Sequence, residues 1–70
     1  MITRNCLVQA KCDFEKGPKK NEVVEVSNVF NTQISNHLRI TLISLREYPE
    51  QCYDESLFSL LQLPINLNHI

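Results

Sequence analysis

The stretches Glu22–Phe30, EVVEVSNVF, and His37–Leu45, HLRITLISL, are the two most strand-like runs of the chain. Both are rich in β-branched and other apolar residues, which fit the pleated, half-buried surface of a sheet. Asn31–Asn36 lies between them, and its polar, turn-prone composition suits a hairpin connection of about six residues. We therefore expect these runs to form the central antiparallel pair of a small β structure.

The first of these strands alternates imperfectly. Its better apolar face holds Val24, Val26 and Phe30, whereas valines at odd positions interrupt the period of two. Such an interruption indicates either cover on both faces or a β-bulge, which would lie near Ser27–Asn28.

The second strand changes its apolar face midway. Its apolar residues up to Leu42 share one face, and the pattern then changes to Ile43 and Leu45 on the other. A strand whose buried face changes in this way is typically bulged or bent. The change favours a bent, closed barrel over a flat sheet.

The flanking segments complete a five-stranded pattern. Residues 5–14 alternate with small or apolar side chains on one face, which predicts a half-buried first strand. The loop Glu15–Asn21 follows and contains the Gly17-Pro18 turn signal. Beyond the central pair, Arg46–Gln51 reads as a turn and Cys52-Tyr53 as a short strand. The fold class is therefore mainly β, a small five-stranded antiparallel barrel.

The segment after Tyr53 has two interpretations. Asp54 is a good N-cap and Glu55 suits the first turn of a helix. Residues 54–62 form either a helix of about two turns or a 3₁₀ turn near residues 54–58 that leads into a closing strand at Phe58–Leu61. The apolar tail, residues 62–70, either covers an open barrel end or pairs with another copy of the chain as a homodimer.

Size and composition indicate one domain over residues 1–70. Leu, Ile, Val and Phe fill 23 of the 70 positions, which is too apolar for a disordered chain. Residues 1–20 carry five basic and two acidic side chains, a net of +3, whereas residues 21–70 carry two basic and six acidic, a net of −4. The total of −1 lacks the overall basic excess that is usual for nucleic-acid binders.

The cysteines fit a reducing compartment. Cys6 and Cys12 would lie roughly 20 Å apart along one strand, whereas a disulfide requires Cα atoms within about 7 Å. Cys52 remains open as a partner for either one. No stretch is long and apolar enough to span a bilayer, and the N-terminus lacks a signal-peptide core, so we expect a cytoplasmic protein without membrane contact.

No catalytic or cofactor pattern emerges from the chain. His37 and His69 have no signature spacing to any cysteine, and the Cys and His residues are too scattered for a typical zinc site. A single glycine does not make a phosphate-binding loop. We therefore expect a protein that is not an enzyme and holds neither a metal nor a cofactor.

Three sequence features together resemble small, mostly uncharacterised SH3-like barrel proteins of phages and prophages. These are an early cysteine, Cys6; a basic loop running into a Val-rich strand, Lys19–Val26; and the closing element Tyr53-Asp54-Glu55-Ser56-Leu57-Phe58. Ile40-Thr41-Leu42 stands where such proteins typically carry Leu-Thr-Leu. Members often have glycine in place of Asn21 and an aromatic residue in place of Val24. Their pattern normally stops near Leu61, before the apolar tail of this chain.

The resemblance implies a binding groove between the loop after the first strand and the loop joining the central strands. It also implies a structural role for Tyr53. Tyr48, in a turn beside Pro49, is the better candidate for partner contact, because tyrosine is enriched at interfaces. The candidate partner-binding residues are Lys16, Lys19, Lys20, Arg39, Arg46 and Tyr48.

The expected function is that of a non-enzymatic phage accessory protein. It would bind and inhibit a host protein, such as a component of an anti-phage immune system of the CRISPR-Cas kind, in the host cytoplasm. One alternative is nucleic-acid binding through the basic loop, residues 11–20, with affinity that falls steeply as salt rises. Another is an oligomeric sponge for a small nucleotide signal, which requires a basic pocket between protomers.

Overall fold

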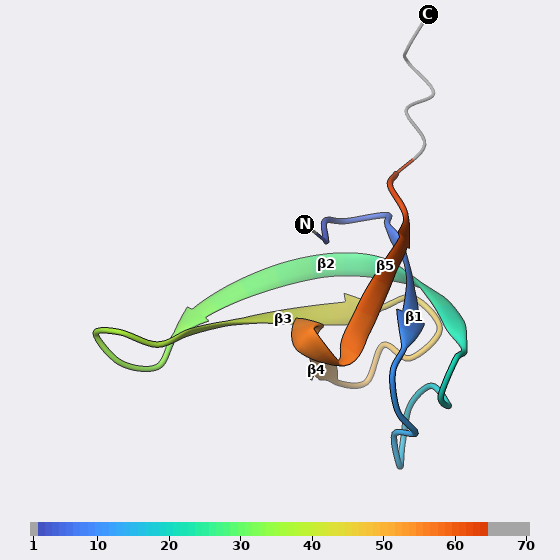
Figure 1. Ribbon diagram of the computed structural model, residues 1–70, viewed down its shortest axis with the longest axis horizontal. Helices are drawn as coiled ribbons and strands as arrows, with labels where there is room; N and C mark the ends of the chain where they lie inside the picture. Colours follow the sequence, from blue (N-terminus) through green and yellow to red (C-terminus); the bar gives the residue numbers. More distant parts are fainter. Residues whose placement is uncertain (1, 65–70) are drawn as a thin grey trace, which may run out of the picture.

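The computed structural model describes residues 2–64 and shows a mainly β protein with one five-stranded antiparallel sheet. The strand order is β4-β3-β2-β1-β5, and the edge strands β4 and β5 do not pair with each other within the described residues (Figure 1). The elements are β1 (Leu7–Ala10), β2 (Val23–Gln33), β3 (Arg39–Leu45), β4 (Cys52–Asp54), the 3₁₀ turn η1 (Glu55–Leu57) and β5 (Phe58–Gln62).

The expected central pair is present. β2 and β3 pair antiparallel from Val26 opposite Leu45 to Gln33 opposite Arg39. β2 is longer than expected, because it continues to Gln33, into the polar segment Asn31–Asn36 that was expected to form the hairpin connection. The turn between the strands is correspondingly short, spanning residues 34–38.

The core lies where the start of β2 meets β1, β5 and the end of β3. It is closed at one side by the aromatic rings of Phe14, Tyr53 and Phe58, whose centroids lie 5.0 to 6.0 Å apart. The alternation predicted for the first strand is confirmed for its central part only, because residues 11–14 leave the sheet. The buried apolar side chains are Ile2, Cys6, Val8, Ala10, Val24, Val26, Ile43, Leu45, Tyr53 and Phe58.

Of the two explanations for the imperfect alternation in β2, cover on both faces or a bulge near Ser27–Asn28, the structure shows the bulge. Val26 lies opposite Leu45 and Asn28 lies opposite Ser44, so Ser27 is an extra residue in β2. An extra residue reverses which side chains face the core.

Phe30 was predicted to share the face of Val24 and Val26, and this is wrong. The bulge turns Val29 toward the core, where it packs against the buried cluster, and leaves Phe30 42% exposed.

The change of face in β3 also has a different meaning from the one expected. Ile43 and Leu45 are fully buried, but Leu38 on the opposite face is 50% exposed. The irregularity that was expected in β3 lies in β2 instead. The second apolar face of β3 therefore lies on the outside of the sheet and does not serve a second core.

The two interpretations of residues 54–62 are resolved in favour of a turn and a strand. Asp54 caps η1, because its Oδ1 accepts a hydrogen bond from the Ser56 N–H at 2.9 Å. The chain then enters β5, which pairs with β1. A two-turn helix is wrong here, since Phe58 must be extended to reach the core. Of the predicted tail, residues 62–64 are exposed and residues 65–70 lie outside the described part.

Candidate binding site

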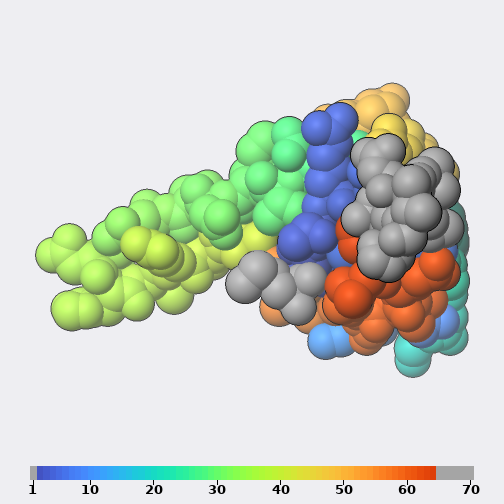
Figure 2. All heavy atoms as spheres, turned by 90° about the horizontal axis from the view of Figure 1, so that it is seen from above, coloured from blue at the N-terminus to red at the C-terminus, as the bar shows by residue number. Residues whose placement is uncertain are grey.

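The distal parts of β2 and β3, residues 28–42 with their turn, form an arm that extends away from the rest of the molecule (Figures 1 and 2). β1 pairs with β2 only at Val23–Glu25, and β4 pairs with β3 only at Leu42–Ser44. Most of the arm therefore consists of two strands with no third strand beside them. Every side chain from Asn31 to Arg39 is exposed.

One face of the arm is apolar. The register places Phe30 opposite Leu42, and the same parity adds Ile40, Ile34 and Leu38 toward the tip. Phe30, Ile34 and Leu38 are 42%, 57% and 50% exposed. We call this surface the outer face, since it lies on the side of the sheet opposite the buried Ile43.

The other face of the arm is polar, although it continues the core-facing side of the sheet. Asn31 lies opposite Thr41, whose hydroxyl donates a 2.9 Å hydrogen bond to Asn31 Oδ1. Gln33 lies opposite Arg39 on the same face. Compared with an ordinary sheet, the arm has its apolar and polar sides reversed.

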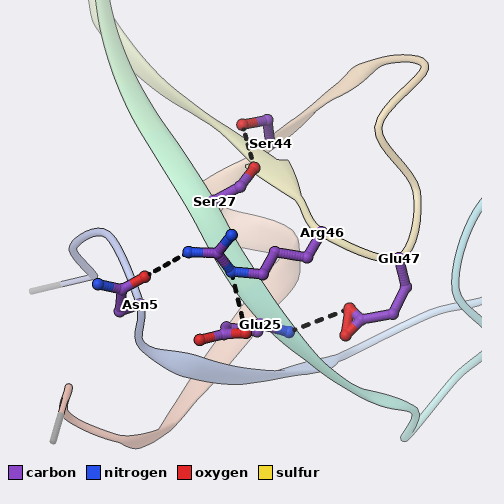
Figure 3. A network of polar contacts seen from close by, with 6 residues as sticks. All are labelled: Asn5, Glu25, Ser27, Ser44, Arg46 and Glu47. Carbon is purple, nitrogen blue, oxygen red and sulfur yellow. Dashed lines mark hydrogen bonds and ion pairs between the residues drawn. The ribbon is translucent and has the colours of Figure 1, made fainter.

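A polar network holds the base of the arm (Figure 3). Ser27 Oγ lies 2.8 Å from Ser44 Oγ, which ties the bulge to β3. Arg46 forms an ion pair with Glu25 at 3.0 Å and donates to Asn5 Oδ1 at 2.7 Å. Because these groups are partly exposed, the ion pair itself contributes at most about 1 kcal/mol. Together the two contacts of Arg46 link the residue after β3 to β2 and to the N-terminal segment.

The expected contact loop, Glu15–Asn21, lies at the end of the molecule away from the arm tip (Figure 1). Lys16, Lys19 and Lys20 are exposed, and the loop beneath them is well organised. The Lys20 N–H donates to Asp13 Oδ1 at 2.7 Å, and the Phe14 N–H donates to the Pro18 carbonyl at 3.0 Å. The structure therefore does not bring this loop beside the segment 31–36, as a groove shared between them would require.

Two residues explain the shape of this loop. Gly17 packs against the ring of Tyr53, and a Cβ at position 17 would lie 2.5 Å from the Tyr53 hydroxyl oxygen. That hydroxyl donates to the Lys16 carbonyl at 3.3 Å, so Tyr53 anchors the loop from the core. Asn21 ends the loop with a φ of 72°, the left-handed region in which asparagine is tolerated and glycine is favoured.

Tyr48 is half-buried and packs against the core. Its hydroxyl donates to Glu22 Oε2 at 2.7 Å, while the Lys19 N–H donates to Glu22 Oε1 at 3.0 Å. The Lys19 N–H and then the Tyr48 hydroxyl hold the pKa of Glu22 below its ordinary value. The Glu22 carboxylate in turn raises the pKa of Tyr48. Tyr48 thus has a partner within the chain.

The six candidate residues therefore fall into separate places. Lys16, Lys19 and Lys20 share the loop, and Tyr48 lies beside its end through Glu22. Arg46 lies at the base of the arm, and Arg39 lies on the arm itself. Sequence reasoning missed the outer face as a site, because Leu38, Ile40 and Leu42 were taken as buried. The signal that reveals it is the predicted bulge, once its effect on parity is carried along the strand.

Cys6, Cys12 and Cys52 are free thiols, which are buried, half-buried and exposed respectively. Within residues 2–64, no three His, Cys, Asp or Glu side chains are grouped so as to hold a metal ion. The described residues contain no helix with the length and apolar character needed to cross a membrane.

Comparison with known proteins yields no match to a family model, a curated protein or a solved structure.

Proposed function

We propose that the protein is a non-enzymatic binding module that recognises another protein through the outer face of its arm. The observation that carries this proposal is the exposure of Phe30, Ile34 and Leu38 on one side of a projecting hairpin. Contiguous exposed apolar surface is rare on monomers and marks interaction sites. Since each of these side chains is about half exposed, covering the remainder contributes about 1 kcal/mol apiece.

The charge of the arm defines the chemistry of the partner. Residues 28–42 contain no Asp or Glu, and their Arg39 lies on the polar face, whereas Arg46 at the base of the arm is paired with Glu25. A surface complementary to the outer face is therefore apolar and uncharged. This combination favours a folded protein over a nucleic acid, whose phosphates require several basic groups and no broad apolar face.

We further infer an SH3-like barrel in which the two halves of the sheet wrap around the core. The strand order, the 3₁₀ turn between β4 and β5, and the sharing of β2 between both halves support this. With the resemblance to phage-encoded barrels, the proposed partner is a host protein of the bacterial cytoplasm, such as a component of an anti-phage immune system, which the protein inhibits.

Nucleic-acid binding through the loop of residues 11–20 is the second candidate, and the exposure of Lys16, Lys19 and Lys20 favours it. The affinity of this loop for nucleic acid would be limited by its two acidic residues, Asp13 and Glu15.

Affinity capture from a bacterial host lysate with three forms of the full chain tests both candidates. The forms are the wild type, an arm variant carrying Phe30→Ser and Leu38→Ser, and a loop variant carrying Lys19→Glu and Lys20→Glu. We expect a protein that is retained by the wild type and the loop variant and lost by the arm variant. With that protein purified, each arm substitution should weaken binding roughly 5-fold, the equivalent of the about 1 kcal/mol that covering each side chain contributes.

The proposal is overturned if the arm variant captures the same proteins as the wild type. Loss of nucleic acid from the loop variant alone would support the second candidate instead. Circular dichroism of all three forms distinguishes loss of binding from loss of folding.

A further inference from the structure

The free edge of β2 is a second feature of the arm, distinct from its outer face. β1 leaves this edge after Glu25, and the N-terminal segment follows it only as far as the hydrogen bond from the Asn5 N–H to the Val26 carbonyl. From Asn28 to Gln33, no strand of the described chain lies on the side of β2 away from β3.

The register shows which backbone groups this edge presents. The Ile34 N–H donates to the Leu38 carbonyl at 2.9 Å, so Ile34 directs its backbone groups toward β3. In an antiparallel pair, residues alternate between inward and outward hydrogen-bonding directions. Thr32 therefore points toward β3, whereas Asn31 and Gln33 direct their N–H and carbonyl groups away from it.

The edge beyond the bulge carries neither charge nor proline. Natural edge strands are protected against pairing by Lys, Pro, an inward-pointing charge, a β-bulge or a very short length, and here the bulge at Ser27 lies before the edge segment. The segment Asn28–Gln33, NVFNTQ, contains no charged residue and no proline. A two-stranded hairpin is also marginally stable in water and gains stability from a third strand. The edge is thus built to accept another strand.

We propose that the strand it accepts is β2 of a second copy of this chain. The two strands would pair antiparallel about a two-fold axis at Asn31, with Val29 opposite Gln33 of the second copy. A two-fold interface brings identical groups together. Electrostatic complementarity in such an interface requires an edge without charge, and this edge meets that requirement.

Pairing would also join the two outer faces. Directly opposed residues of antiparallel strands lie on the same side of a sheet. Phe30 of one copy would lie opposite Thr32 of the other, so that four strands carry one continuous apolar surface. This inference concerns the edge alone and holds whether or not a host protein binds that surface.

Light scattering and amide hydrogen exchange by NMR, measured on the full chain over a wide range of concentrations, test the pairing. We expect a dimeric mass at high concentration, with the Asn31 and Gln33 amides becoming protected as the dimer forms. Asn31→Lys sets two like charges opposite each other and should yield a monomer at concentrations where the wild type is dimeric. Gln51→Lys, the control in the exposed turn before β4 at the other edge of the sheet, should leave the dimer intact.

A monomer at every concentration overturns the inference. So does a dimer in which the Asn31 and Gln33 amides exchange as fast as in the monomer, since that dimer uses another surface. If only an extended segment of a foreign protein protects these amides, the edge pairs with a partner other than a second copy and the inference is again wrong. The arm variant Phe30→Ser with Leu38→Ser retains the β2 edge, so it separates this outcome from failure of the proposed function.

Discussion

The two ends of the β2–β3 pair use the same kinds of residue in opposite ways. In the rest of the molecule outside the arm, which we call the body, Val24, Val26 and Ile43 are at most 1% exposed and belong to the core. In the arm, Phe30 and Leu38 lie in the same two strands and remain 42% and 50% exposed. Hydrophobic sequence alone therefore does not distinguish a residue that stabilises the fold from one that is kept for binding. The distinction depends on which face of the strand the residue occupies.

The largest change in stability that we expect from this comparison is the loss caused by Ile43→Ala. Ile43 is fully buried opposite Val29, and its truncation leaves a cavity that should cost about 2–5 kcal/mol of unfolding free energy. Ile40→Ala is the matched control, since the same residue type lies in the same strand on the outer face, and its cost should be clearly smaller. Urea denaturation measures both, and equal losses would contradict the division into body and arm.

Gly17→Ala should have the next largest effect. The new Cβ would lie 2.5 Å from the hydroxyl oxygen and 2.8 Å from Cε2 of Tyr53, so the ring must shift within the core. We expect a loss of about 1–3 kcal/mol, which is typical of overpacking. In a double-mutant cycle with Tyr53→Ala, the cost of the Gly17 substitution should largely disappear. Additive losses would show that the ring is not the obstacle.

Phe30→Ala should change stability far less, by within about 0.5 kcal/mol, because its side chain lies on the outer face. Thermal unfolding at low protein concentration measures this, with Leu38→Ala as a second outer-face variant. A loss above about 1 kcal/mol would mean that the outer face is packed within the chain, against the reversed polarity described for the arm.

The smallest effect concerns pH and the body alone. The pKa of Glu22 is lowered in the folded state, so its contribution to stability is present above its ordinary pKa and is lost as pH falls through the folded value. Tyr48→Phe removes one of the two hydrogen bonds that lower it. NMR titration of the Glu22 carboxyl should show a pKa nearer its ordinary value, still lowered by the Lys19 N–H. An unchanged pKa would mean that the Tyr48 hydroxyl has no effect on it.

Much of the fold could be predicted from the sequence because local patterns carry it. The alternation in β1 and β2 and the cap at Asp54 are properties of neighbouring residues. They predicted the mainly β class and a helix or 3₁₀ turn that begins at Asp54, without deciding between the two. Predicting the outer face from the sequence required one further step, which was to apply the change of parity at the bulge to the residues that follow it. The bulge near Ser27 was predicted, but its consequence for Phe30, three residues further on, follows only when the parity change is applied to the whole distal strand.

The position of the arm could not be predicted from the sequence for a different reason. Where β1 and β4 stop pairing is decided by the lengths of several separate segments. At the base of the arm, Arg46 donates to Asn5, which is 41 positions away along the chain. No local pattern encodes such a contact, so Arg46 was expected to bind a partner.

The extra residue at Ser27 lets the two halves of β2 follow different sequence parities within one strand. Deleting Ser27 would leave Asn28 opposite Ser44 and Phe30 opposite Leu42, so strict alternation without the bulge would still turn Val29 inward and Phe30 outward. A single-codon deletion at this position could therefore straighten the strand while every residue of the outer face keeps its place. In lineages of such proteins, the bulge can be gained or lost by insertion and deletion without a change in the surface that the arm presents.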